Sequence, residues 1–428
     1  MIYSEIAAGL VAAVTFIALA VGSVPMLRLN RAGIAVVGAC ALLALNVVTL
    51  TQSAQTIDPS TLLLLMSMMM INAVLELGGF FNWAGQLVIE RAGSPLILLI
   101  LVVLMGGFLS ALFLNDPVVL MLTPLVCGVT LRLRRNPIPY LVALACAANI
   151  GSTATITGNP QNILIGASSG IPYLTFLLHL GPIALVGLVI VVFVIRALYP
   201  AEFRANRFDL PDGEANLPHV GPGTPEAVMS MTTAVDMVYI PVLRKSMIVI
   251  ALMLIGFFIG MPVPLAAFFA ATALLITRRI KSQKILLLVD WPLLVMFSGL
   301  FVVTGTLELT GVSQKLFDVV QGLAYSGVAP LALVTALLSN TISNVPAVLL
   351  FRPLIPHFPN PTQAWLTLAA ASTLAGNLTL IGSIANLIVA EQAGKLGIKL
   401  TFMEYLRAGV LITALTMIVA VVWLQIVT

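Results

Sequence analysis

"ANIGSTATITGNPQN", residues 148–162, is the stretch of sequence on which the fold depends. It lies in a long apolar segment, yet it carries many hydroxyl and carboxamide side chains, two glycines and one proline. We expect a helix to break at Gly158 and to restart with Asn159 as N-cap and Pro160 as its first residue, because proline is tolerated there but not in a helix interior. The break leaves peptide groups without helical partners, and four polar side chains are suited to satisfy them: Thr155, Thr157, Asn159 and Asn162.

The composition predicts a polytopic, all-α membrane protein. Hydrophobic residues make up 60% of the 428 residues, charged residues only 8%, and the mean hydropathy is +1.11. The apolar segments are ~20 residues long, enough for a helix to cross the ~30 Å core of a bilayer. The N-terminus has no basic region before its apolar run, so we expect a first span there and not a cleaved signal. No nucleotide-binding or catalytic motif is present, so neither an enzyme nor ATP-driven activity is expected.

Ten full spans, two hairpins and two interfacial helices account for the apolar sequence. The spans are predicted at about 4–26, 33–51, 60–77, 138–169, 174–198, 244–262, 263–280, 286–309, 362–394 and 404–426. Stretches 95–133 and 327–356 are each interrupted by a polar turn and are predicted to be re-entrant helical hairpins, because such a turn is tolerated at membrane depth only when protein or water surrounds it. Each follows an amphipathic segment, 80–93 or 312–325, that is expected to lie along the interface.

The positive charges indicate the orientation of this layout. Eighteen of the 20 Lys and Arg residues fall on one side, and only Lys315 and Arg352 fall on the other. The eighteen are Arg28, Arg31, Arg91, Arg132, Arg134, Arg135, Arg196, Arg204, Arg207, Arg244, Lys245, Arg278, Arg279, Lys281, Lys284, Lys395, Lys399 and Arg407. The positive-inside rule therefore predicts a protein of a bacterial-type inner membrane, with a cytoplasmic linker at 200–243 and both termini outside.

The two halves of the chain resemble each other. The matching segments are "LELGG" (75–79) with "LELTG" (307–311), "NDPVVL" (115–120) with "NVPAVL" (344–349), and "TITGNPQNILI" (155–165) with "TLIGSIANLIV" (379–389). Each half, 1–199 and 244–428, holds five spans, one of them broken, and one hairpin. Because the number of crossings is odd, the second half is expected to be inverted relative to the first, which is the architecture of many secondary transporters.

These paired hairpin tips and broken helices resemble those of the ion transporter superfamily. That superfamily includes ArsB-type arsenite efflux permeases, NhaD-type Na+/H+ antiporters and dicarboxylate/sodium symporters. The segments "GGFFNWAGQLVIERAG" (78–93) and "ALFLNDPVVLMLTPLV" (111–126) are most similar to the ArsB-type proteins. The resemblance implies a substrate site between the tips and the helix breaks. Carried over, it comprises Asn115, Asp116, Thr155, Thr157, Gly158, Asn159 and Asn162 in the first half, and Ser343, Asn344, Thr379, Gly382, Ser383 and Asn386 in the second.

Asp116 is the candidate for proton coupling. A carboxylate in a hairpin tip at membrane depth is costly, and its counterpart in the second half is the neutral Val345. We expect Asp116 to exchange a proton between two access states and so to couple proton entry to export of a neutral solute such as As(OH)3 or its antimony analogue. The alternative is that Asp116 only caps the second helical arm.

Other functions stay open at this point. They are Na+- or H+-coupled transport of an organic or inorganic anion, Na+/H+ exchange and, from a different class, an ion channel. No Lys or Arg falls in the expected site, which disfavours an anion, and the symporters' Ser-Asn-Thr tip is replaced by Leu-Asn-Asp and Ser-Asn-Val. We expect transport to be driven by a proton gradient or by Na+, and we expect no cofactor.

The expected partners are a small inorganic solute and the lipid bilayer, and nucleic acid is not among them. A soluble ATPase subunit would join an arsenite exporter, and a monomer is favoured. The histidines are scattered without metal-ligand spacing, so no metal site is expected. Asp290 is expected to cap a helix, and Glu76 and Glu308 to lie at the interface.

Overall fold

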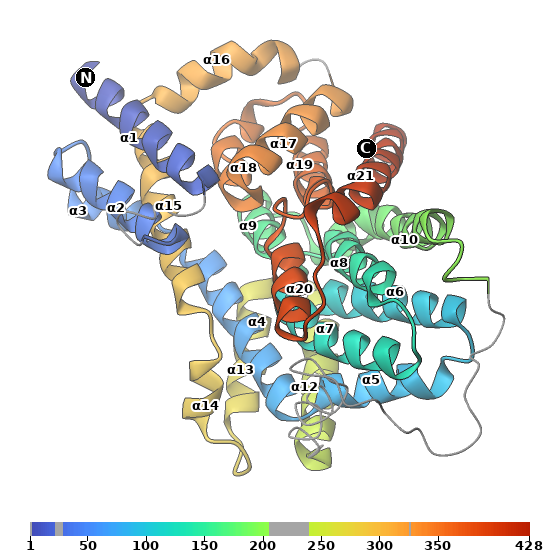
Figure 1. The fold of residues 1–428 in the computed structure, drawn as a ribbon. Coiled ribbons are helices and arrows are strands. Elements are labelled where there is room, and N and C mark those ends of the chain that lie inside the picture. Colours follow the sequence, from blue (N-terminus) through green and yellow to red (C-terminus); the bar gives the residue numbers. More distant parts are fainter. Residues whose placement is uncertain (1, 22–28, 205–238, 325–326) are drawn as a thin grey trace.

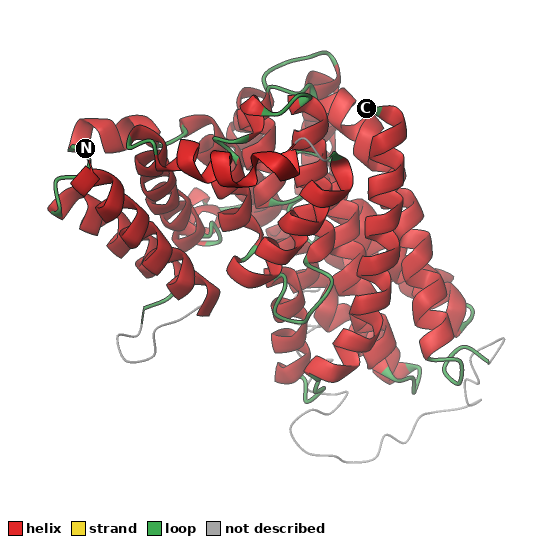
Figure 2. Ribbon diagram, turned by 90° about the horizontal axis from the view of Figure 1, so that it is seen from above, coloured by secondary structure: helices red, strands yellow, loops and turns green. Residues whose placement is uncertain are grey.

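The computed structural model describes residues 2–21, 29–204, 239–324 and 327–428. In these ranges the chain forms helices joined by loops (Figure 2). The helices before residue 200 are α1 Ile2–Val21, α2 Arg31–Ala44, α3 Leu50–Thr56, α4 Pro59–Leu77, α5 Phe80–Arg91, α6 Pro95–Leu112, α7 Asn115–Arg132, α8 Pro137–Thr153, α9 Pro160–Ser169 and α10 Tyr173–Leu198.

The helices after residue 239 follow in a similar order. They are α12 Ile240–Phe258, α13 Val263–Leu275, α14 Ser282–Leu287, α15 Trp291–Leu309, α16 Val312–Ala324, α17 Val328–Ile342, α18 Asn344–Phe351, the 3-10 turn Ile355–His357, α19 Pro361–Ala375, α20 Ile384–Lys395 and α21 Phe402–Val427. The interfacial helices expected at 80–93 and 312–325 are present as α5 and α16. In Figure 1, α16 runs along the upper edge of the molecule and α20 lies beside α7 near its middle.

Seven of the described helices are long and apolar enough to cross a membrane. They are Tyr3–Val21, Pro59–Leu77, Pro95–Leu112, Tyr173–Leu198, Ile240–Phe258, Trp291–Leu309 and Phe402–Val427. Large apolar side chains remain exposed along one face of such helices, as with Ile6, Leu10 and Val14 on α1. Their spacing of about one helical turn forms a stripe that a bilayer would cover, as expected for a multi-pass membrane protein.

Three of the predicted spans have different bounds in the structure. The span expected at 33–51 ends at Ala44, because Asn46 adopts a left-handed conformation with φ 52 and Thr49 then starts α3 with a capping box. The spans expected at 263–280 and 286–309 are separated by α14, and α15 begins only after Asp290, whose side chain accepts a hydrogen bond from the amide of Leu293. The predicted cap at Asp290 is therefore confirmed. The turn between α14 and α15 was not predicted, because the sequence around it is apolar.

The limits of two other spans also need comment. Helix α12 begins at Ile240, before the predicted start at residue 244, and Pro241 occupies its first turn, where the missing donor costs nothing. The predicted end of the first span at residue 26 lies outside the described residues.

Both broken helices are confirmed. Helix α8 ends at Thr153 and α9 begins at Pro160, with Asn159 in extended conformation as its N-cap. In the second half α19 ends at Ala375 and α20 begins at Ile384. Each hairpin region also contains two helices joined by a tight turn, and its second arm begins at an asparagine, Asn115 or Asn344.

The two hairpins differ in length. The second arm of the first hairpin, α7, has 18 residues, whereas α18 has only 8. Arg352 caps α18 in a helical conformation, but Pro353 has no amide hydrogen to donate to the next carbonyl group, so the arm stops at Phe351. The link between α17 and α18 is Ser343, a non-glycine residue with φ 81. The second hairpin therefore extends less far beyond its tip than the prediction of 327–356 implied.

Contacts between helices run across the two halves. Helix α2 packs against α15, and α13 packs against α4 in the corresponding manner. Helices α1, α2 and α15 form one side of the molecule, and α6, α8 and α10 form the other (Figure 1). Within the second group, a Cβ atom on Gly151 of α8 would overlap the carbonyl oxygen of Gly107 on α6. These two helices touch backbone to backbone, a close approach that small residues permit inside membranes.

Candidate functional site

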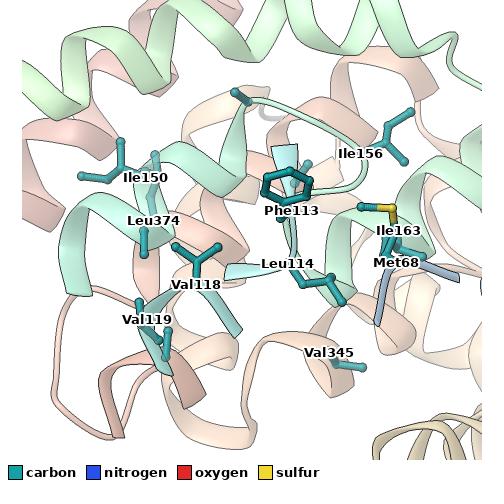
Figure 3. Close-up of a cluster of buried hydrophobic side chains, with 14 of the residues drawn as sticks. Met68, Phe113, Leu114, Val118, Val119, Ile150, Ile156, Ile163, Val345 and Leu374 are labelled. Carbon is teal, nitrogen blue, oxygen red and sulfur yellow. The ribbon is translucent and has the colours of Figure 1, made fainter. Parts of the chain in front are cut away.

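The first hairpin tip is bonded directly to the first helix break. The backbone amide of Asn115 donates to the carbonyl oxygen of Gly158 at 3.0 Å, and its side-chain amide donates to Oδ1 of Asn149 at 3.2 Å. The apolar residues at the tip, Phe113 and Leu114, lie in a cluster of buried side chains that includes Ile163 of α9 (Figure 3). The tip is therefore fixed both by packing and by hydrogen bonds to the unwound segment.

Asn162 satisfies the peptide groups freed by the first break. Its Nδ2 atom donates to the carbonyl oxygens of Ser152 at 3.1 Å, Thr153 at 3.4 Å and Thr155 at 3.0 Å. Its own backbone amide donates to Oδ1 of Asn159 at 2.8 Å, which is the expected N-cap bond. Unpaired carbonyl groups are costly away from water, and here one buried carboxamide serves three of them.

Two threonines of the first unwound segment contact neighbouring helices. The hydroxyl of Thr155 donates to the carbonyl oxygen of Ala111 on α6 at 2.5 Å, and that of Thr157 lies 3.5 Å from the hydroxyl of Tyr173. They therefore tie the break to the first hairpin and to the start of α10.

The second break repeats this arrangement. Nδ2 of Asn386 donates to the carbonyl oxygen of Gly376 at 2.8 Å and to that of Thr379 at 3.1 Å. A Cβ atom on Gly158 would overlap the backbone of Ser152, and one on Gly382 would lie 3.0 Å from the oxygen of Gly376. Both glycines therefore allow the unwound chain to fold back closely on the preceding helix.

Asn149 links the two breaks. Its Nδ2 atom donates to Oδ1 of Asn377 at 2.9 Å and to Oδ1 of Asn386 at 3.0 Å, while its Oδ1 accepts from the hydroxyl of Ser383 at 3.0 Å. All four side chains are buried. One asparagine of the first half thus bonds three residues of the second.

Thr373 of the second half accepts hydrogen bonds from two residues of the first half. Its hydroxyl accepts from Nδ2 of Asn159 at 3.3 Å and from Nε2 of Gln161 at 3.1 Å. In the alignment of the two repeats, Thr373 matches Asn149 and Ser383 matches Asn159. The two halves therefore meet through equivalent positions at the helix breaks.

A small cavity of about 40 Å³ lies between the two hairpin tips. A few water molecules would fill such a space. Its polar lining consists of Arg31, Asn115, Asp116, Gln161, Ser343, Asn344 and Ser383. Val345, the apolar counterpart of Asp116, also lines it, and Figure 3 shows Val345 below the side chain of Leu114.

Five of the residues expected from the sequence line this cavity, and eight do not. Those that line it are Asn115, Asp116, Ser343, Asn344 and Ser383. The others lie in the unwound segments or in the first turn of the helix that follows each break: Thr155, Thr157, Gly158, Asn159, Asn162, Thr379, Gly382 and Asn386. The threonines and asparagines among them contact backbone and neighbouring side chains.

Arg31 and Gln161 also line the cavity, although the sequence did not single them out. Arg31 is the first residue of α2. In the sequence it is one of the eighteen basic residues assigned to the cytoplasmic side, and it indicated only the orientation of the chain. The expectation that no Lys or Arg reaches the site is therefore wrong. Gln161 follows Pro160 in the opening motif, and that position in the first turn of α9 was the available signal.

Asp116 does not cap its helix. Helix α7 begins at Asn115, its N-cap is Leu114, and no side chain caps it. The alternative interpretation of Asp116 as an N-cap is therefore wrong, because the helix starts two residues earlier than that interpretation requires. Asp116 is half-buried beside the cavity.

The tip asparagines line the cavity and each carries an unpaired acceptor. Asn115 and Asn344 both line it and both are buried. Among the described residues, their Oδ1 atoms have no hydrogen-bond partner. Since buried polar atoms are normally paired, two orphan acceptors at equivalent tips indicate a ligand that donates hydrogen bonds.

A polar cavity between two helix breaks in an all-helical membrane protein is the arrangement found in many secondary transporters. Residues 13–375 match the CitMHS family, described as "Citrate transporter", so the chain belongs to that family of secondary transporters within the ion transporter superfamily. The resemblance found in the sequence is confirmed at that level.

Two relatives and one solved structure add detail. The silicon efflux transporter LSI3 of Oryza sativa is 31% identical over 87% of this chain and 87% of its own. A Dictyostelium discoideum protein provisionally named transporter arsB is 26% identical over 92% of this chain and 87% of its own. The crystal structure of the Alcanivorax borkumensis YdaH transporter covers 99% of this chain and 98% of its own with a TM-score of 0.58 at 13% identity, which shows a shared fold.

Proposed function

We propose that this protein exports a small, neutral, hydroxylated solute of the As(OH)3 or Sb(OH)3 type in exchange for protons. The observation that carries the proposal is the pair of unpartnered Oδ1 atoms of Asn115 and Asn344 at the cavity. Each can accept a hydrogen bond from a hydroxyl group of the solute. A solute with three hydroxyl groups can bond both tips at once and still donate to a third oxygen, such as that of Ser383 or Ser343.

The size of the cavity and the relatives support this solute class. A space of about 40 Å³ suits a molecule of a few heavy atoms, whereas a tricarboxylate would require a much wider site. The names of two relatives refer to silicon efflux and to arsB. Silicic acid and arsenous acid are both neutral, compact hydroxides at physiological pH, so one site chemistry serves both.

Asp116 is the proposed proton carrier. It lies at the cavity without a hydrogen bond or ion pair among the described residues, while its counterpart Val345 cannot titrate. An ionised carboxylate inside a membrane requires a counter-charge, and Arg31 lines the same cavity. Proton binding to Asp116 would remove that requirement and permit the opposite access state.

The helix breaks support protons over Na+ as the coupling ion. Carbonyl oxygens of an unwound helix are the ligands that a hard cation would use. In this chain they already accept from the Nδ2 atoms of Asn162 and Asn386. An amide nitrogen thus occupies the place that Na+ would take in each half.

The transport cycle is proposed to use inverted repeats. The same order of helices in both halves and the reciprocal bonds of Asn149 and Thr373 support a repeat of 1–199 by 244–428, joined by the linker 200–243. The hairpins are proposed to re-enter the membrane. The linker would be cytoplasmic and the termini outside, in a monomer of a bacterial-type inner membrane that can recruit a soluble ATPase subunit.

Arg31 favours one second candidate, transport of a small anion. A guanidinium in the cavity is a natural partner for a carboxylate or an oxyanion, and the family description refers to citrate. Under this alternative Arg31 binds the substrate directly and does not serve as counter-charge to Asp116.

The test uses everted membrane vesicles from a bacterium that lacks its own arsenite exporter. An imposed proton gradient should drive uptake of labelled arsenite that saturates, and silicic acid should compete, whereas citrate and Na+ should not. Citrate uptake without arsenite uptake would favour the anion alternative. Flux that depends only on the arsenite gradient and does not saturate would indicate a channel and contradict the proposal.

A further inference from the structure

A second polar cavity, of about 280 Å³, lies apart from the cavity between the tips. Its polar lining includes Gln52 and Gln55 of α3, Thr304 and Glu308 of α15, and Arg352 at the end of α18. None of these residues belongs to the site described above. We name this space the second vestibule.

Helix α18 connects the two cavities. Asn344 and Val345 at its start line the cavity between the tips, and Leu349 and Arg352 at its other end line the second vestibule. A helix of 8 residues is about 12 Å long, so the two spaces are separated by only that length. A solute that leaves the tips along α18 would enter the vestibule.

Arg352 is held at the wall of the vestibule. Its backbone amide donates to the carbonyl oxygen of Val348 at 2.9 Å, and its guanidinium carbon lies 5.5 Å from the centre of the buried Phe301 ring. In the described part of the chain it forms no salt bridge. Its hydrogen-bond donors therefore stay available to a solute, while the aromatic face restricts the orientation of the guanidinium.

The position in the first hairpin that corresponds to Arg352 is occupied differently. In the repeat alignment, Thr123 stands where the second half has Arg352, and it is fully buried with its hydroxyl donating to Val119 at 2.6 Å. Helix α7 also continues past Pro124 to Arg132, whereas α18 stops before Pro353. The vestibule therefore exists because the return arm of the second hairpin is short.

Helix α3 forms the other wall. A Cβ atom on Gly305 would overlap the side chain of Thr56, so α3 rests directly on α15 at this glycine. The capping box of Thr49 and Gln52 starts α3 at the opposite end. Both ends of α3 are therefore held in place, and its two glutamines, Gln52 and Gln55, line the vestibule.

We propose that the second vestibule is a transient binding site for the exported solute on the outer side of the membrane, which depends on the function proposed above. Arg352 and the glutamine amides donate to the solute's oxygens, while Glu308 and the side-chain oxygen of Gln55 accept from its hydroxyl groups. On the proposed layout Arg352 belongs to the outer side, where Lys315 is the other cation. The ligand class is a small neutral polyhydroxylated solute.

The test compares two outer cations in the same vesicle assay. Everted vesicles that carry Arg352→Gln should release arsenite into their lumen poorly. The KM for lumenal arsenite, measured by exchange, should rise about tenfold, because the solute loses a hydrogen bond to a charged group. Arg352→Lys should recover part of the loss. Lys315→Gln is the matched control, because Lys315 pairs with Glu5 away from the vestibule, and its KM should equal that of the parent.

A second readout does not depend on the charge of Arg352. In a background without Cys40, Cys127 and Cys146, Gln55→Cys should react in intact cells with a membrane-impermeant thiol reagent, and a bulky adduct should block efflux. Unchanged kinetics in Arg352→Gln together with full efflux from labelled Gln55→Cys would overturn the vestibule while the parent still transports. Absence of arsenite transport by the parent would overturn the proposed function, and the vestibule assignment with it.

Discussion

The side-chain amide of Asn149 on α8 donates to Oδ1 of Asn386 on α20 at 3.0 Å, in the interior of the protein. Through this bond the broken helix of the first half supports that of the second. Asn386 uses its own amide to satisfy the carbonyl oxygens of the second break. A change at position 149 would therefore disturb a helix break that is distant in sequence.

Asn149→Leu should destabilise the protein. The substitution removes one hydrogen bond from each of Asn377, Ser383 and Asn386, and a buried polar atom that loses its partner costs ~1–3 kcal/mol. Thermal unfolding in detergent should show a clear drop in Tm. Thr341→Val is the matched control, since that exposed hydroxyl bonds only the carbonyl of Leu337. Equal melting temperatures for the two variants would contradict the importance of the Asn149 network.

Asp116→Asn should separate solute binding from proton coupling. Because Asp116 caps no helix, the substitution should leave the hairpin folded. Uptake driven by a proton gradient should be lost, whereas exchange of arsenite for arsenite should continue, because it requires no net proton movement. Parallel assays on the same vesicles measure both rates. If gradient-driven uptake matched the parent across the pH range, Asp116 would not carry the proton.

Arg31→Gln should distinguish a neutral solute from an anion. A hydrogen bond to a charged group contributes ~1.5–3 kcal/mol, and about 1.4 kcal/mol corresponds to a factor of ten in affinity. If Arg31 contacts an anionic substrate, KM should rise about tenfold or more. For a neutral hydroxide we expect KM for arsenite to change by less than about threefold, with the main effect on the pH dependence of transport. Initial rates over a range of solute concentrations give the answer.

The two break glycines should tolerate alanine unequally. At Gly158 a methyl group would overlap the backbone of Ser152, which cannot yield without moving α8. At Gly382 the nearest atoms are Oδ1 of Asn340 at 2.9 Å and the carbonyl oxygen of Gly376 at 3.0 Å, and the first belongs to a side chain that can rotate. Gly158→Ala should therefore reduce folded yield and transport more than Gly382→Ala. Size-exclusion chromatography of the two variants measures the yield of folded protein. Equal yields would contradict this order.

The helix breaks and hairpin tips could be predicted because their signals are local. Gly158 and Pro160 cannot continue a helix, and Asn159 is suited to start one, so a few adjacent residues determine the geometry. The same reasoning failed at Asp116. Helix α7 starts two residues earlier than expected, and this displacement places Asp116 at the cavity instead of at the helix cap.

The lining of the cavity could be predicted only in part. Arg31 lies far from Asp116 in sequence, and nothing in its neighbourhood distinguishes it from the other basic residues. The short return arm of the second hairpin was also missed, because the apolar residues up to 356 look like continuous helix and the effect of Pro353 depends on where α18 begins. Contacts between remote segments, and not composition, decide these features.

The backbone contact between Gly107 and Gly151 limits how the protein can move. The backbones of α6 and α8 touch here, so a movement that separates the first hairpin from the broken helix behind it would break this contact. We therefore expect the hairpin and the broken helix to change position together.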